Sequence, residues 1–244
     1  MIKRLFVAAF GCLIFAACPS WAADAPKPVA PSTFFPLSKG TTWAYRGPAE
    51  WQVGTEVKKR VVFWTMEVTE TIEAGGVLAA RIKGHPDDMV WYEEGKAPSD
   101  RAILLGKNTY YETEFSLETG RRWADLVAAL GAAGPELGRY LTDGSVLLPL
   151  PLTPDRSWGG EDNPPRDDSM YRWNVEEVAE KKLADIQGVD PAKPVKTYLV
   201  TYRCLGSHEF IEYAEGIGII RYQFGHHGTV SECDMKLIEF RPGR

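Results

Sequence analysis

The sequence is poor in cysteine and has a single long apolar run, at its N-terminus. It contains 4 cysteines among 244 residues, and two of them, Cys12 and Cys18, lie within or next to that run. No later segment stays apolar over the ~20 residues that a membrane-spanning helix needs. We therefore expect no membrane span in the remainder of the chain.

Basic residues are fewer than acidic ones, 28 against 33. The chain carries a formal net charge of −5, and it has no cluster of lysine and arginine large enough to outweigh that balance. Nucleic acids and anionic lipid headgroups attract basic surfaces. The composition therefore argues against either as the main partner.

Familiar catalytic motifs are missing. The sequence has no Gly-x-Ser-x-Gly elbow, no His-Glu-x-x-His motif and no phosphate-binding glycine loop. The acid pairs Asp87-Asp88, Glu93-Glu94 and Asp167-Asp168, together with His85, read as solvated loop residues, because acid–base catalysis needs carboxylates that face each other across a cleft. We predict no catalytic residue and no cofactor, with a calcium site in the loop of residues 161–168 as an alternative.

The N-terminus reads as a secretory signal. Lys3 and Arg4 precede an apolar segment at Leu5–Ala17, and small residues follow at a typical cleavage site. We place the cut between Ala22 and Ala23. Removing two positive charges and no acid changes the net charge from −5 to −7. A mature protein of this kind is periplasmic or secreted.

Cys18 offers a second way of processing the same segment. Ala16-Ala17-Cys18 resembles the end of a lipoprotein signal, in which the cysteine receives the lipid. Lipidation would tether the protein to a membrane without changing its fold. After either cut, residues 23–33 read as a proline-rich tether, and residues 34–244 as a single β-rich domain.

Most of the domain shows the period-two alternation of half-buried strands. The clearest examples are residues 62–68, 77–83, 109–115, 171–175 and 198–204, and residues 89–93 form a further aromatic-rich candidate. Residues 217–224 and 229–240 flank a Gly-His-His-Gly link and predict a hairpin.

One segment has helical periodicity instead. Trp123, Leu126, Val127 and Leu130 form an apolar stripe within residues 119–133. The fold class predicted is mainly β: a curved antiparallel sheet, like a half-barrel or a sandwich, with one or two helices packed on one face or across one open end.

Two segments echo each other. Residues 35–45 and 148–160 both run from Pro-Leu through a polar turn to a tryptophan, and each precedes a strand. They indicate either two related β units in one domain or the ordinary recurrence of proline and glycine at turns.

Cys204 and Cys233 remain after the signal is removed. Both alternate in phase with apolar residues, so both should point inward. In an oxidising compartment this pattern predicts a disulfide between them; two free thiols are the alternative.

Three histidines, His208, His226 and His227, lie in the same C-terminal region. Imidazole is a ligand for zinc or copper, so these residues form a candidate metal site. Their spacing matches no standard metal-binding pattern, and solvated turn histidines are the alternative.

Aromatic side chains are the candidate ligand-binding residues. Trp91-Tyr92 and Tyr110-Tyr111 are consecutive pairs in predicted strands. Because neighbouring strand residues face opposite sides, each pair places one ring outside the core. A curved sheet with such rings can hold an apolar ligand, and a large β core is the simpler explanation of the same residues.

The opening of the predicted domain carries a resemblance. The motif Pro-Leu-x-x-Gly-x-x-Trp-x-Tyr at residues 36–45 resembles the start of exported bacterial β-rich proteins and lipoproteins of unknown function. Those proteins also carry a later strand that is matched by residues 213–221. The sequence departs from the lipoproteins at Phe15, where they usually have leucine. The resemblance implies a β-rich envelope protein and brings no catalytic residues.

These observations lead to three functional hypotheses. The first is a non-enzymatic envelope protein that binds an apolar ligand or a protein partner, for lipid or lipoprotein handling or for envelope assembly. The second is a periplasmic enzyme with a polar cleft of convergent histidine and acidic groups. The third is a purely structural envelope protein.

Overall fold

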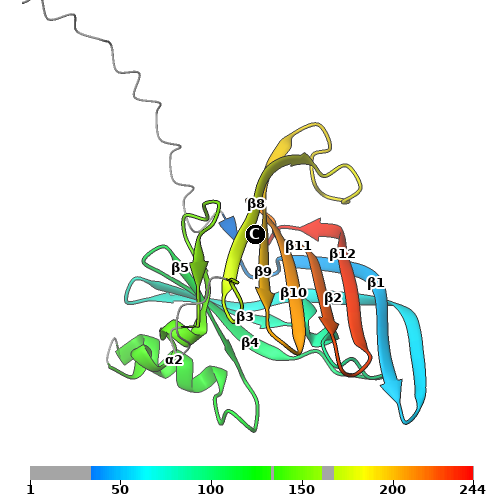
Figure 1. Ribbon diagram of the computed structural model, residues 1–244. Helices are drawn as coiled ribbons and strands as arrows, with labels where there is room; N and C mark the ends of the chain where they lie inside the picture. Colours follow the sequence, from blue (N-terminus) through cyan, green and yellow to red (C-terminus); the bar gives the residue numbers. More distant parts are fainter. Residues whose placement is uncertain (1–33, 133–134, 161–167, 244) are drawn as a thin grey trace, which may run out of the picture.

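A computed structural model of the protein describes residues 34–132, 135–160 and 168–243. These residues form one twelve-stranded antiparallel sheet that curves into a nearly closed barrel (Figure 1). The predicted signal, its cleavage site and the tether lie outside the described residues, as does most of the loop proposed for calcium. The prediction of a curved antiparallel sheet is confirmed.

The strands follow one another around the barrel in chain order, and the first and last strands pair. The first half contains β1 (Thr42–Val53), β2 (Glu56–Ala74), β3 (Val77–Lys83), β4 (Asp100–Gly106), β5 (Thr109–Glu114) and β6 (Val146–Pro149). The second half contains β7 (Ser157–Trp158), β8 (Trp173–Lys182), β9 (Pro194–Arg203), β10 (Ser207–Ala214), β11 (Gly218–His226) and β12 (Ser231–Arg241). β1 pairs with β12, so the sheet ends at β6 and β7 in the middle of the chain.

The two echoing segments sit at equivalent places in this order. β1 begins within residues 35–45, and β7 lies within residues 148–160, so each segment contains the start of a six-stranded half. Trp43 and Trp158 lie in those two strands.

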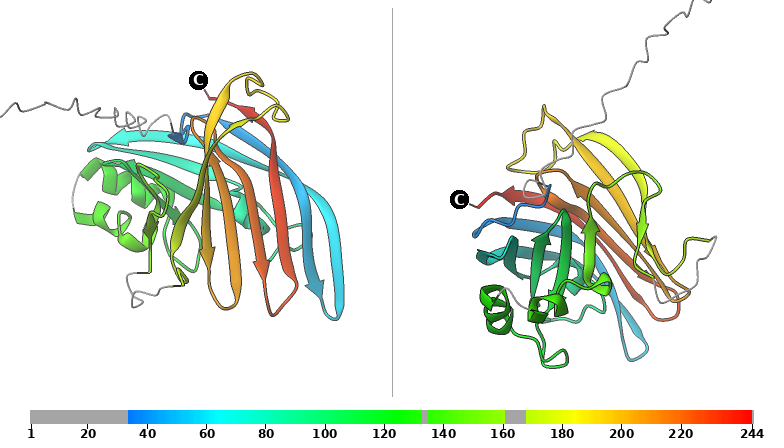
Figure 2. Two further views of the ribbon diagram at one scale, coloured as in Figure 1. Left: turned by 45° about the horizontal axis from the view of Figure 1, so that its top comes forward. Right: turned by 90° about the vertical axis from the view of Figure 1, so that its left-hand side faces the viewer.

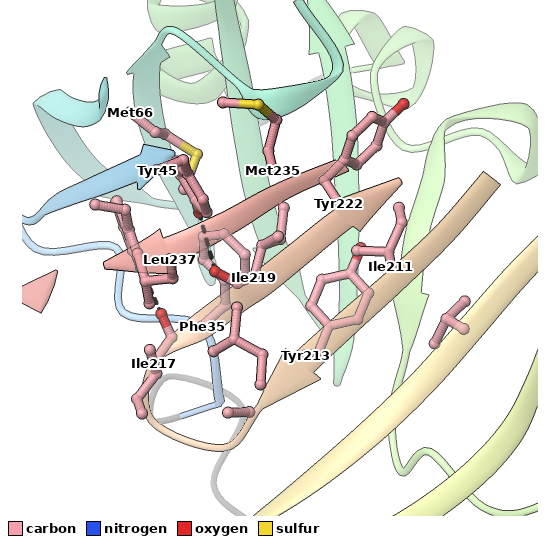
Figure 3. Close-up of a cluster of buried hydrophobic side chains, with 14 of the residues drawn as sticks. Phe35, Tyr45, Met66, Ile211, Tyr213, Ile217, Ile219, Tyr222, Met235 and Leu237 are labelled. Atoms are coloured by element: carbon pink, nitrogen blue, oxygen red, sulfur yellow. Dashed lines mark hydrogen bonds between the residues drawn. The ribbon is translucent and has the colours of Figure 1, made fainter. Parts of the chain in front are cut away.

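The inward faces of the strands form one aromatic-rich core. Figure 3 shows part of it, including Tyr45, Tyr213 and Tyr222. The Tyr45 hydroxyl donates to the carbonyl of Ile219 at 3.0 Å, and the Trp43 indole donates to the carbonyl of Ile217 at 2.6 Å. Buried hydroxyl and indole donors of this kind need such partners.

The first two described residues, Phe34 and Phe35, pack inside the barrel. Phe34 and Phe35 are fully buried, and the Phe34 ring lies 6.4 Å from Tyr110 on β5 and 5.5 Å from Tyr198 on β9. A Cβ atom at Gly218 would lie only 2.9 Å from the Phe35 ring. The phenylalanine pair therefore spans the interior and requires glycine beside it.

A short 3₁₀ helix, η1 (Pro86–Met89), packs against three strands at its end of the sheet, β2, β11 and β12. Met89 is buried in the core, and residues 90–95 form turns. The strand predicted at residues 89–93 is therefore wrong. Proline at the start of η1 favours this turn over an extended strand.

The predicted helix is confirmed as α2 (Trp123–Ala132). Leu126 and Leu130 are buried against alanine and leucine side chains on the outer face of β3 and β4, in a second apolar cluster. Figure 2 shows the helix beside the sheet. The helix covers the outer face of β3 and β4, and η1 is the element that contacts β2, β11 and β12. Two further 3₁₀ helices follow, η2 (Pro135–Arg139) and η3 (Asp143–Ser145).

Candidate functional site

The β1–β2 hairpin carries a strand edge that no other strand covers. β1 pairs with β2 from Glu56 to Glu67, whereas β3 pairs with β2 only from Glu67 onward. In the described part of the chain, the backbone of residues 56–63 makes no backbone hydrogen bond outside the hairpin. We call residues 56–63 the hairpin edge; it lies at the right-hand border of the sheet in Figure 1. Such an edge can accept another strand.

Three apolar side chains lie on the outer face of the hairpin edge, with Lys59 between two of them. Val57, Val61 and Phe63 are 56%, 50% and 67% exposed. Their neighbour Val62 points the other way, into the core. The Arg46 guanidinium lies 5.5 Å from the centroid of the Phe63 ring. A row of exposed apolar side chains on one strand is typical of an interaction surface.

The hairpin edge also carries three consecutive cations, Lys58, Lys59 and Arg60. Lys59 pairs with Glu50 on β1, and Arg60 pairs with Glu94 at 2.6 Å; both cationic side chains are more than half exposed. Composition does not predict this group, because three residues do not alter the acidic balance of the whole chain. The available signal was the placement of Val57, Val61 and Phe63 at odd positions around three consecutive cations.

A second feature is a buried ionic cluster that fastens η1 to β4 and β5. The Arg101 side chain is 7% exposed and places Nη1 at 2.8 Å from Asp87 Oδ2 and 2.6 Å from Glu112 Oε1. Asp88, 4% exposed, accepts a hydrogen bond from the Ser99 amide at 2.9 Å. The expectation of solvated acids at residues 87 and 88 is therefore wrong, because the turn that carries them folds into the barrel.

His85 and Glu209 extend the cluster across the interior. His85 is 2% exposed rather than solvated, and its Nδ1 lies 3.0 Å from Asp87 Oδ1. Burial opposes a charge on His85, but the carboxylates of Asp87 and Glu112 outweigh that effect and raise its pKa. The Tyr222 hydroxyl donates to Glu209 Oε2 at 3.2 Å. Burial raises the pKa of the Glu209 carboxyl to about 7, and the charge of Asp87 adds to the shift.

Each carboxylate of this cluster has an ionic or hydrogen-bond partner. The cluster joins residues of η1, the loop before β4, and strands β4, β5, β10 and β11. Removing one partner of a buried ion pair strongly destabilises the folded protein, because the other charge stays buried without a partner. We infer that the cluster holds η1 against the strands of the barrel.

The four aromatic residues predicted to bind a ligand do not come together. Trp91 is half exposed, with its ring 4.9 Å from that of His226, whereas Tyr92 is buried against Trp51 at 5.0 Å. Tyr110 is fully buried, and its hydroxyl accepts a hydrogen bond from the Phe35 amide at 3.2 Å. Tyr111 packs on the outer face with α2. Tyr92, Tyr110 and Tyr111 thus serve packing.

The hollows of the protein are mixed in character. Four of them, of about 290 to 440 Å³, each have charged side chains in their lining. Sites for apolar ligands are lined predominantly by apolar side chains. These hollows therefore give little support to an acyl-chain ligand.

The three C-terminal histidines border one hollow of about 370 Å³ on the outer face of the sheet. The rings of His208 and His227 lie 5.2 Å apart, whereas His226 turns toward Trp91 and accepts a hydrogen bond from the Thr229 amide at 2.9 Å. Among the described residues, no three histidine, cysteine or acidic side chains are grouped to hold a metal ion.

The predicted disulfide is wrong. Cys204 and Cys233 are both free thiols. Cys233 pairs with Phe224, which pairs with Glu209, which pairs with Tyr202, two residues before Cys204. Three strand spacings of about 4.8 Å separate the two cysteines by about 14 Å along the sheet, whereas a disulfide needs Cα atoms within about 7 Å.

No protein-family model matches the sequence, and no curated protein matches it. A protein proposed to be exported, with a YmcC-like fold, from Bacteroides fragilis is 10% identical over 86% of this chain and 99% of its own, with a TM-score of 0.40. A proposed lipoprotein from Parabacteroides distasonis is 12% identical over 86% of this chain and 98% of its own, with a TM-score of 0.40. A likeness at this level establishes neither a family nor a function.

In the described part of the chain, no helix has the length and apolar character needed to cross a membrane.

Proposed function

We propose that this chain is an exported envelope protein that binds a protein partner through the hairpin edge. One observation carries the proposal: residues 56–63 combine an unpaired backbone edge with the exposed side chains of Val57, Val61 and Phe63. Extended segments bind to such edges through main-chain hydrogen bonds, and side-chain contacts supply the specificity. The N-terminal signal pattern and the opening motif at residues 36–45 support export.

A protein partner accounts for the structure better than an apolar small ligand does. Large side chains fill the interior of the barrel, among them Trp43, Tyr45, Tyr213 and Tyr222. The hollows described above have charged linings. The exposed apolar surface lies instead on a strand edge, where another polypeptide can pair.

Site-specific photo-crosslinking in the producing cell tests this proposal. A photoreactive amino acid at position 57 or 63 is expected to give a discrete adduct with one envelope protein, because these side chains would lie in the interface. The same group at position 117 is the control: Leu117 is fully exposed but lies in the loop between β5 and α2. Adducts are read by immunoblotting and mass spectrometry.

A second substitution shows whether the adduct depends on the apolar stripe. Phe63→Asp should reduce the adduct formed from position 57, since it removes the largest exposed apolar side chain of the edge. Equal labelling from positions 57, 63 and 117 would overturn the proposal, because it would reflect random collisions.

A further inference from the structure

We infer that the occupant of the hairpin edge is an extended strand with alternating apolar and acidic residues, supplied by another protein. This inference rests on the proposed function and names the chemistry of the partner. It follows from the different character of the two faces of the edge.

Successive residues of a strand point to opposite faces of the sheet. On the outer face the hairpin edge presents Val57, Val61 and Phe63, with Lys59 between the two valines and paired with Glu50. On the inner face it presents Lys58 and Arg60. A strand paired beside it keeps the same alternation. Its outer side chains would meet the apolar stripe, and its inner side chains would meet the two cations.

The protein's own contacts show that these cations accept carboxylates. Arg60 binds Glu94 at 2.6 Å, yet the two side chains remain 57% and 59% exposed. Lys58 has no ionic partner among the described residues. An acidic residue of an incoming strand can therefore pair with Lys58 and compete with Glu94 for Arg60.

The same charges disfavour a second copy of this chain at the hairpin edge. Pairing two such edges would bring the run of Lys58, Lys59 and Arg60 against itself. Like charges that lie opposite each other on paired strands are destabilising. The hairpin edge of one copy therefore repels the hairpin edge of another and favours an acidic strand.

Peptide binding to the full mature chain tests the inference. Two short peptides, blocked at both ends, alternate valine with glutamate or valine with lysine, and their affinities are measured by titration calorimetry. We expect the valine–glutamate peptide to bind about tenfold more tightly. Replacing alternate valines by proline should abolish its binding, because proline removes main-chain donors.

Charge reversal provides the decisive comparison. The Lys58→Glu/Arg60→Glu variant should reverse the preference, so that the valine–lysine peptide binds more tightly. The control is Lys107→Glu/Lys193→Glu, which makes the same charge change at two exposed positions outside the strands and should leave the preference unchanged. Circular dichroism and thermal melting confirm that both variants are folded.

The possible failures are distinguishable. Equal affinity for both peptides would overturn the acidic preference and leave edge binding intact. If neither peptide binds but crosslinks at positions 57 and 63 persist, strand addition is wrong and partner binding stands. If both are absent, the proposed function fails as well.

Other occupants have their own signatures. Self-association in sedimentation that is lost in the Lys58→Glu/Arg60→Glu variant would identify a second copy at the edge. Binding to vesicles of anionic phospholipid, without peptide binding, would identify a lipid surface. Either result would overturn the inference.

Discussion

At the scale of single residues, one turn has the composition of an exposed loop but is largely buried. Gly-His-Pro-Asp-Asp at residues 84–88 has the composition of a solvated turn, and the chain does turn there. His85 and Asp88 are nonetheless buried and Asp87 is half-buried, where it pairs with Arg101 of β4, which in turn pairs with Glu112 of β5. Local composition predicts the turn, but only the tertiary arrangement shows which charges meet.

The titration of Glu209 has a measurable consequence. Because its pKa is raised from 4.5 to about 7 in the folded protein, the stability that Glu209 contributes is complete below pH 4.5 and is lost as the pH rises through about 7. The raised pKa of His85 acts in the same direction, starting near pH 6.5. We expect the thermal unfolding midpoint to fall between pH 5 and pH 8.

The variant Glu209→Gln isolates this effect. Glutamine keeps an oxygen that can accept from Tyr222 but cannot ionise, so the variant should unfold at a higher temperature than the wild type at pH 8. The difference should shrink at pH 5. Glu118→Gln, in an exposed loop, is the control. A wild-type midpoint that rises from pH 5 to pH 8 would contradict the assignment.

At the scale of elements, periodicity predicted most strands and the helix but not their neighbours. The predicted strand at residues 77–83 coincides with β3, and the stripe from Trp123 to Leu130 lies in α2. Alternation also placed Cys233 facing inward, as observed. It could not show that two strands separate Cys233 from the strand that ends beside Cys204, because pairing order is a property of the whole sheet.

The binding surface shows the same limit. The sequence displays the alternation of Val57, Lys59 and Val61, but it does not show that β3 begins to pair only at Glu67. The unpaired edge results from the length of β2, 19 residues, compared with 7 in β3. Relative strand length thus exposes the hairpin edge.

The packing of α2 can be tested by truncating one side chain. Leu126 is fully buried in the outer cluster with Ala79 and Ala102, so Leu126→Ala should lower the free energy of unfolding by about 2–5 kcal/mol. Chemical denaturation measures the change. Leu117→Ala, at a fully exposed position, should leave the stability nearly unchanged; equal effects would show that α2 does not stabilise the fold.

At the scale of the whole molecule, the repeated opening segment coincides with the division of the sheet into two halves. Residues 35–45 contain the start of β1, and residues 148–160 contain β7. The two segments therefore open two runs of six consecutive strands each, β1 to β6 and β7 to β12. The echo alone could not distinguish this arrangement from chance recurrence of turn residues.

Export concerns the whole molecule, and the first residue of the mature chain shows how the signal was cleaved. Mass spectrometry of the protein purified from the envelope should find a mature chain that begins at Ala23, as the signal pattern predicts. A chain beginning at a lipid-modified Cys18 would contradict this and would mean membrane anchoring. Intact residues 1–22 would contradict export by cleavage of the signal.

The pairing of β1 with β12 governs when the barrel can be completed. A ribosome makes β1 first and β12 last, so Trp43 waits for its partner Phe240 until nearly all of the chain has been synthesised. Contacts between residues so distant in sequence slow folding. Until then, β1 has no neighbour on that side of the sheet. We therefore expect the nascent chain to be sensitive to proteolysis and prone to aggregation until its final residues emerge.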